Sequence, residues 1–141
     1  MDLEGKVWIS RVINYSGSFS LFRGDDDIPM SRFRIIKMVS SMGTLRYIYN
    51  LFDAGFITVA NGRAHYSLYN PVDIRRTVIP LLSEYPLKDK RKHKQYQIWR
   101  SGIAMLCRIG SDGWTDTEIS EFDVIVHNLE RQDRGKQQSH R

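Results

Sequence analysis

The chain has 141 residues, of which 41% are hydrophobic, and a formal net charge of +5. This composition predicts one soluble domain with a single core. Its longest apolar runs fall far short of the roughly 20 residues of a membrane-spanning helix, so no membrane partner is expected.

The sequence of the first half of the chain predicts a helix, a strand hairpin, a second helix and a second strand hairpin, in that order. Apolar residues at helical spacing predict a helix over 3–16, and alternating residues predict strands over 18–23 and 32–38, joined by an acidic turn. A second helix is expected over 40–55. The clearest local signal is the pair Asn61-Gly62 between two β-rich runs, because this pair suits the positive φ angles of a type I′ turn.

The second half predicts helices alone. Asn70 and Pro71 are a good N-cap and first residue for a helix that Pro80 should kink or end. Two more helices are expected over 94–109 and 115–132, the last capped by Thr115 or Thr117. The resulting order, α-β-β-α-β-β-α-α-α, predicts an α+β fold with helices on one face of a four-stranded antiparallel sheet.

The domain is expected to cover residues 1–132, and the basic stretch 133–141 should be a flexible tail because it lacks apolar anchors. No signal peptide opens the chain, and Asp2 and Glu4 argue against a transit peptide. A protein of this sequence that works in an organelle would therefore be encoded there or already processed.

The predicted order and four stretches of sequence resemble the LAGLIDADG homing endonuclease and maturase family over about residues 7–132. The stretches are ISRVINYSGSF (the nine-residue signature followed by Ser-Phe), DAGFITVANGRAHYSLYNPVDIRRTVIPLLSEYPL, KHKQYQIWRSGIAML and WTDTEISEFDVIVHNL. The resemblance implies an α-β-β-α-β-β-α fold with a four-stranded antiparallel saddle sheet that lies on nucleic acid, followed here by extra C-terminal helices. It also implies that the signature helix dimerises or packs on a second copy of itself in the same chain. Since this chain has one copy of the signature, a cutting form would be a homodimer.

Two positions depart from the signature. Ser16 stands where the resemblance implies an Asp or Glu that holds Mg²⁺ between scissile phosphates, and Asn14 is also neutral. A hydroxyl is a poor sole ligand for Mg²⁺, which prefers anionic oxygen. Arg11 replaces a small residue at which two signature helices would approach closely. We therefore expect no catalytic residue, no cofactor (Mg²⁺ being needed only by an endonuclease) and a monomeric free form.

No other metal site is expected. The acidic run Asp25, Asp26 and Asp27 could attract a cation, but it falls in a turn at the far end of the first strand, where acids are commonplace. His65 and His93 have no partners at metal-ligand spacing. The single cysteine, Cys107, lies in an apolar run and is expected to be a buried thiol in a reducing compartment.

Strand alternation predicts a polar set without acids on one face of the sheet. The set comprises Ser18, Ser20, Arg32, Arg34, Thr58, Arg63 and His65. A second basic group follows Pro86 and consists of Lys88, Lys90, Arg91, Lys92 and Lys94. The missing acids favour nucleic-acid binding over a merely solvated sheet face, and the lysine-rich group suits phosphates, although a solvated helix face is its alternative.

The aromatic residues divide into two groups. Tyr69, Tyr85 and Trp99 lie among apolar residues and are expected to be core or hinge residues. Phe22 and Trp114 are less easily placed, and either could stack on an unpaired base.

The sequence therefore predicts a nucleic-acid-binding protein that has lost nuclease chemistry. RNA (rRNA or intron RNA) is the preferred partner, with DNA possible, and the role is that of an intron maturase or a structural part of an organellar ribonucleoprotein such as a ribosome, beside protein neighbours. The expected location is mitochondrial, or otherwise intracellular. The alternatives are a homodimeric DNA homing endonuclease with an altered metal site and a DNA-binding regulator.

Overall fold

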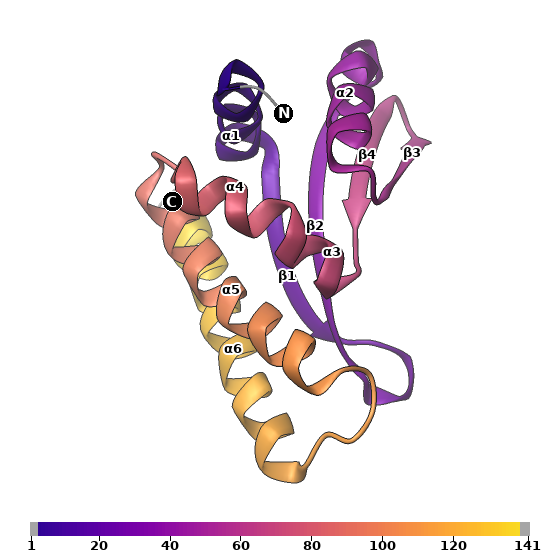
Figure 1. Cartoon of the computed structure of the whole chain (residues 1–141). Coiled ribbons are helices and arrows are strands. Elements are labelled where there is room, and N and C mark those ends of the chain that lie inside the picture. Colours follow the sequence, from indigo (N-terminus) through magenta and orange to yellow (C-terminus); the bar gives the residue numbers. More distant parts are fainter. Residues whose placement is uncertain (1–2, 139–141) are drawn as a thin grey trace.

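The computed structural model describes the backbone of residues 3–138 and side chains up to residue 133. Its elements are α1 (Leu3–Ser16), β1 (Gly17–Arg23), η1 (Asp25–Asp27), β2 (Pro29–Met38), η2 (Val39–Ser41), α2 (Met42–Phe52), β3 (Phe56–Ala60), β4 (Arg63–Leu68), α3 (Pro71–Arg76), α4 (Val78–Glu84), α5 (Lys90–Ile109) and α6 (Asp116–Gln138). Figure 1 shows their arrangement. Over residues 3–138 no helix is long and apolar enough to cross a membrane.

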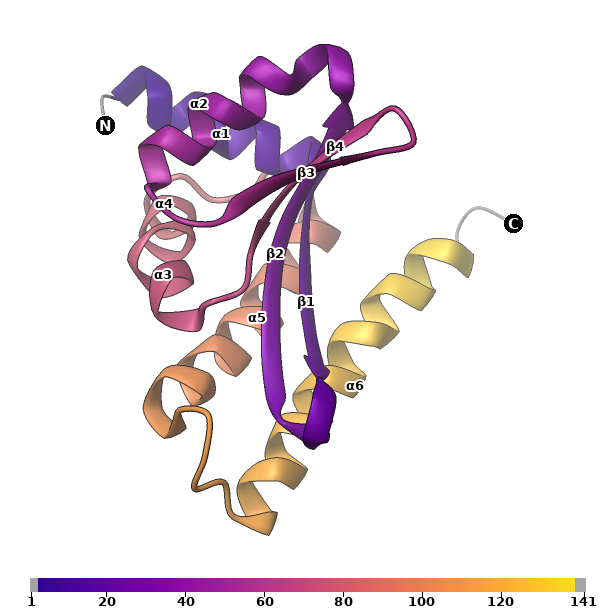
Figure 2. The ribbon, with the colours of Figure 1, turned by 90° about the vertical axis from the view of Figure 1, so that its right-hand side faces the viewer.

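The four strands form an antiparallel sheet in the order β1-β2-β4-β3. Helices α1 to α5 lie on one side of it, while the β3–β4 hairpin projects toward the other side (Figure 2). Helix α6 packs against α5 and reaches β1 at the edge of the sheet. The predicted α+β class, with an open four-stranded antiparallel sheet, is confirmed, and one face of the sheet is left without a layer of helices.

The turn between β3 and β4 has the predicted chemistry. Asn61 and Gly62 have φ angles of 55° and 76°, the left-handed values that a type I′ turn requires at both central residues. This turn fixes the register of the hairpin, in which Ala60 pairs with Arg63.

The helix predicted to run past Asn70 is split earlier than expected. Asn70 caps α3 as predicted, its Oδ1 accepting hydrogen bonds from the backbone N–H groups of Val72 and Asp73. The break falls at Thr77 (φ −115°, ψ −70°), although Pro80 was predicted to cause it at its own position. The physical reason is that a proline conflicts with the carbonyl four residues before it, which belongs to Arg76, the last residue of α3.

The helices after residue 87 also differ at their ends from the prediction. Helix α5 begins at Lys90, not at residue 94, because Asp89 caps it through a 2.8 Å hydrogen bond from the N–H of Lys92 to Oδ1. Thr115, the first of the two predicted caps, forms a reciprocal capping box with Glu118. Helix α6 continues to Gln138, so the predicted domain boundary at 132 lies inside a helix, and residues 139–141 of the predicted tail lie outside the described residues.

The core lies between the sheet and the helices. Trp99 of α5 is fully buried, as predicted, and its ring centroid lies 4.8 Å from that of Phe19 while its Nε1 donates to the carbonyl of Ser20. Helix α5 approaches β1 closely at Gly102, where an added Cβ would lie 2.4 Å from a methyl carbon of Leu21. Cys107 is half-buried, and burial raises the pKa of its thiol.

Candidate nucleic-acid interface

The strand register brings the predicted polar set together on the face without helices. Ser18 lies opposite Arg34, Ser20 opposite Arg32, and Thr58 opposite His65. Directly opposed residues of antiparallel strands project from the same face. Arg63 and His65 belong to this face as well, since β4 pairs with both β2 and β3.

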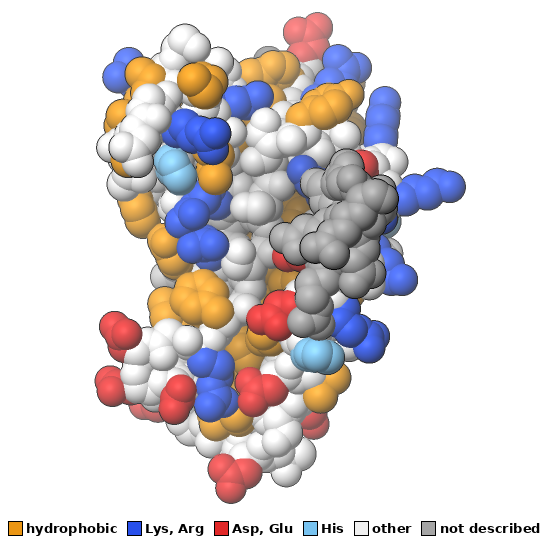
Figure 3. Space-filling model, turned by 180° about the vertical axis from the view of Figure 1, so that it is seen from behind, with side chains coloured by type: hydrophobic (Ala, Val, Ile, Leu, Met, Phe, Trp, Pro, Cys, Tyr) orange, Lys and Arg blue, Asp and Glu red, His pale blue; other side chains and the backbone are white. Residues whose placement is uncertain are grey.

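This face, which we call the open face, carries basic and apolar side chains. Figure 3 views the molecule from this side and shows Lys, Arg and His side chains in a column, with acidic side chains gathered below it and further basic ones along the right-hand edge. No Asp or Glu lies on the open face among the residues of the four described strands. Its apolar members are Phe22, Met30, Ile36, Met38, Phe56 and Ala60, of which the prediction considered Phe22 alone, as a possible stacking residue.

The two arginines of β2 differ in their side-chain contacts. Arg32 donates from Nη2 to the Oγ of Ser20 at 3.4 Å, and its guanidinium carbon lies 5.9 Å from the ring centroid of Phe22. The Nε atoms of Arg32 and Arg34 are buried and have no hydrogen-bond partner among the described residues. The contacts of Arg32 restrict its side chain, so a ligand that binds its guanidinium group costs little further side-chain entropy.

The structure places the aromatic residues in different surroundings. Tyr69 is half-buried in the connection between β4 and α3, and its ring lies parallel to that of Phe56, with 9° between the planes and 5.8 Å between the centroids. Trp114, predicted as a possible stacking residue, packs edge-on against Phe122 and donates from Nε1 to the carbonyl of Gly110. Phe22 is half-buried beneath Arg32.

The second basic group forms the start of α5 and divides by exposure. Lys88, Lys90 and Lys94 are exposed, whereas Arg91 and Lys92 are half-buried and take part in interactions within the chain. Lys92 donates from Nζ to the carbonyl of Ile13 at 3.5 Å. Lys92 was predicted as a phosphate contact, and the structure shows that it also helps to fix α5 against the end of α1.

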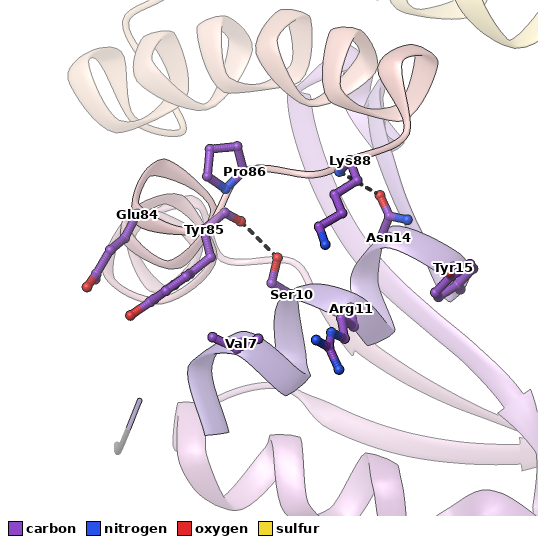
Figure 4. Close-up of a pocket in the computed structure, with 9 residues that line it drawn as sticks. All are labelled: Val7, Ser10, Arg11, Asn14, Tyr15, Glu84, Tyr85, Pro86 and Lys88. Atoms are coloured by element: carbon purple, nitrogen blue, oxygen red, sulfur yellow. Dashed lines mark hydrogen bonds between the residues drawn. The ribbon is translucent and has the colours of Figure 1, made fainter. Parts of the chain in front are cut away.

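Asn14 ties this basic group to the signature helix. Its Oδ1 accepts a hydrogen bond from the backbone N–H of Lys88 at 3.0 Å (Figure 4) and a second one from the N–H of Asp89 at 2.9 Å. One turn earlier, Ser10 donates from Oγ to the carbonyl of Tyr85 at 2.8 Å. No local pattern predicts these contacts, because their partners are about 75 residues apart in the chain.

Ser16 is the last residue of α1, and Gly17 opens β1. A Cβ at position 17 would lie 2.8 Å from the carbonyl oxygen of Ile13, so glycine permits the tight passage from helix to strand. The carboxylate brought to this region by the α4–α5 connection is that of Asp89, and its Oδ1 already caps α5.

The acidic run 25–27 cannot stand in for the missing signature acid. It lies at the opposite end of β1, a strand of seven residues, which corresponds to roughly 20 Å at about 3.3 Å per residue. Figure 2 shows this turn and α1 at opposite ends of β1. Among the described residues, no group of three or more His, Cys, Asp or Glu side chains is placed to hold a metal ion.

Arg11 is exposed on α1, beside the α4–α5 connection (Figure 4). It lines a pocket of about 310 Å³ between α1 and the end of α4, together with Tyr15, Tyr85 and Lys88. Tyr15 is 81% exposed. This side of α1 therefore combines bulky aromatic and cationic groups.

Comparison with solved structures identifies the fold. The chain matches the LAGLIDADG homing endonuclease I-GzeII, solved in complex with a DNA target, with a TM-score of 0.79 and 23% identity over 91% of this chain and 44% of that one. It matches the homing endonuclease I-TnaI with a TM-score of 0.77 and 18% identity over 98% and 99% of the two chains. It matches I-LtrWI, a LAGLIDADG homing endonuclease bound to target DNA, with a TM-score of 0.74 and 21% identity over 86% of this chain and 42% of that one.

These likenesses show that the chain has a LAGLIDADG-like fold, as its sequence indicated. The chain spans less than half the length of I-GzeII and I-LtrWI and nearly all of I-TnaI. No protein-family model and no curated protein sequence matches it.

Proposed function

We propose that this chain is a nuclease-inactive, RNA-binding protein that uses the open face and the start of α5, as a structural part of an organellar ribonucleoprotein or as an intron maturase. The observation that carries the proposal is the combination of a basic sheet face, whose strands contain no acid, with Ser16 at the end of α1. The face supports binding of a polyanion, and the neutral Ser16 argues against metal-assisted cleavage.

The two basic groups have different tasks in this proposal. Lys88, Lys90 and Lys94 are exposed point charges that suit phosphates and carry no base geometry. Arg32 and Arg34 lie on a stiff sheet, with Nε donors that lack partners within the described residues. These arginines are the groups that would contact the RNA at fixed positions and give preference among targets.

Cleavage is tested with the purified protein, Mg²⁺ and a duplex library that contains candidate sites. We expect no cutting by the unaltered chain, because two neutral groups, Ser16 and Asn14, stand at the signature positions. Ser16→Asp restores a carboxylate there, and Ser16→Asn is the control of similar size without charge. Mg²⁺-dependent cutting by the unaltered chain ends the inactive-nuclease proposal, and Asp89→Asn then tests whether Asp89 supplies the metal ligand.

Binding is tested by titrating labelled RNA and duplex DNA at several salt concentrations. Replacing Lys88, Lys90 and Lys94 with Ala should lower the salt slope by about two to three units, since each lost phosphate contact removes about 0.9 of a unit. The matched control is the triple Ala variant of three exposed arginines, Arg46 of α2, Arg75 of α3 and Arg108 of α5, which has the same net charge. Equal losses in both variants would show a net-charge effect without a located binding surface.

RNA is preferred over DNA in this proposal because the neutral residues Ser16 and Asn14 argue against DNA cleavage by this chain. We expect structured RNA to compete better than duplex DNA of equal length. The rival is a homodimeric DNA endonuclease with an altered metal site, favoured by the likeness to homing endonucleases solved on DNA. Tighter binding to one duplex sequence, together with a dimeric mass, would favour the rival.

The exposed side of α1 supports protein neighbours in such a particle. Tyr15, Arg11 and Leu3 all project there, and Leu3 is 65% exposed. The mitochondrial location belongs to the same proposal. Co-sedimentation of the tagged chain with mitochondrial ribosomal particles or with intron RNA would distinguish the two roles.

A further inference from the structure

The open face carries an aromatic pair at its β3 edge that neither a phosphate-binding role nor the core explains. Phe56 is the first residue of β3 and is 47% exposed. Tyr69, just after β4, lies parallel to it with 9° between the ring planes. The two rings are offset, with 5.8 Å between their centroids, so the contact restricts the Phe56 ring while much of the residue stays accessible to solvent.

The pair belongs to the open face itself. Register places Phe56 opposite Ser67, which lies opposite Arg34 on its other side. Thr58, two residues along the same strand, pairs with His65. A ligand that contacts Arg34 and His65 therefore passes beside Phe56.

Charge directs a polyanion toward this edge of the face. At the opposite edge, a pocket of about 300 Å³ between β1 and α6 is lined by Glu130 and Asp133 beside Phe22 and Arg32. These two carboxylates disfavour phosphates near Phe22. Within the described strands, the β4–β3 side of the face bears no acid.

We propose that Phe56, held by Tyr69, is a platform on which one unpaired base of the bound nucleic acid stacks. The inference rests on the proposed nucleic-acid binding and specifies a single-stranded segment, such as a loop, bulge or end, as what the open face takes. A duplex hides the faces of its bases, whereas a splayed base offers a ring that stacks on an aromatic side chain in any sequence. The fixed ring orientation reduces the ordering cost of binding.

The test compares a single-stranded RNA, a single-stranded DNA of the same sequence and the corresponding duplexes. Phe56→Leu keeps an apolar side chain but removes the ring. We expect it to weaken binding of both single strands by about five- to 100-fold and to change duplex binding by less than about twofold. The matched control is Tyr49→Leu, which removes a ring of 42% exposure from α2 on the helix side and should change neither.

A second measurement takes its first readout from the unaltered chain, which does not depend on the folding of a variant. A single-stranded RNA that carries 2-aminopurine at successive positions should show one position whose fluorescence is quenched on binding, and Phe56→Leu should remove that quenching. Equal losses on single strands and duplexes would point to an apolar contact such as one with a thymine methyl group, and would overturn the platform.

The outcomes separate this inference from the proposed function. If the unaltered chain binds RNA with a steep salt dependence while Phe56→Leu binds and quenches unchanged, the platform is wrong and nucleic-acid binding stands. If the unaltered chain binds no nucleic acid, both proposals are wrong.

Discussion

Replacing Asn14 with Ala should loosen the basic group at the start of α5, because one side-chain oxygen joins it to α1. The Oδ1 of Asn14 accepts from the N–H groups of Lys88 and Asp89 at 3.0 and 2.9 Å, both within the range of good hydrogen bonds. A typical hydrogen bond contributes about 0.5–1.5 kcal/mol to stability. Both bonds are solvent-accessible and water can replace them, so the lower half of the summed range applies, about 1–2 kcal/mol.

This loss converts to a measurable shift in melting temperature. At about 2.1 cal/mol/K per residue, a chain of 141 residues has an unfolding entropy of about 0.3 kcal/mol/K. The Asn14→Ala variant should therefore melt about 3–7 °C below the unaltered protein in a calorimetric scan. Asn14→Asp keeps an acceptor oxygen at the same place and is the matched control, with an expected loss of less than about 2 °C.

The same pair of variants tests whether Asn14 holds the segment around Lys88 and Asp89 in solution. Exchange of the Lys88 and Asp89 amide protons should become faster in Asn14→Ala and stay slow in Asn14→Asp. A melting temperature within 1 °C of the unaltered protein, or equal losses in both variants, would show that the contact does not hold the segment in solution.

Three further predictions concern other parts of the chain. Tyr66→Phe removes a 2.6 Å hydrogen bond to the carbonyl of Ala54 and should cost about 1–3 kcal/mol in denaturant titrations. Burial raises the pKa of the Tyr66 hydroxyl in the folded protein. Its contribution to the free energy of unfolding is therefore complete below pH 10 and declines above pH 10, where the tyrosine of the unfolded chain ionises. If the stability of Tyr66→Phe falls between pH 10 and 11 as much as that of the unaltered protein, this reasoning is wrong. Hydrogen bonds from Thr115 lower the pKa of Glu118, so the ionised carboxylate stabilises the fold above about pH 4.5 and this stabilisation is lost as the pH falls further. Glu118→Gln should remove this pH-dependent part of the stability, which is measured as the change in melting temperature between pH 7 and pH 3. The free protein should sediment as a monomer near 16.5 kDa because Arg11 obstructs close approach of two α1 helices, and Arg11→Gly is the variant in which a dimer, if the face permits one, should appear.

Local sequence determined the elements and their order. The spacing of apolar residues, the Asn61-Gly62 turn and the Asn70 cap act over a few residues, so they were readable and the structure confirms them. Alternation also assigned the polar residues of each strand to a face, and the same rule would have placed Phe56 beside Thr58 on the open face. The ends of helices were less accurate, since the break before Pro80 depends on a carbonyl four residues away.

The tertiary structure decided which distant groups meet. The contacts of Asn14 with Lys88 and Asp89 span about 75 residues, and no local pattern specifies them. Likewise, the parallel rings of Phe56 and Tyr69 depend on the pairing of β3 with β4. The packing of α5 against α1 decides which lysines are exposed and which form hydrogen bonds within the chain. These contacts form because burial of the whole core brings the two segments together, and the chemistry of the two partners alone would not do so.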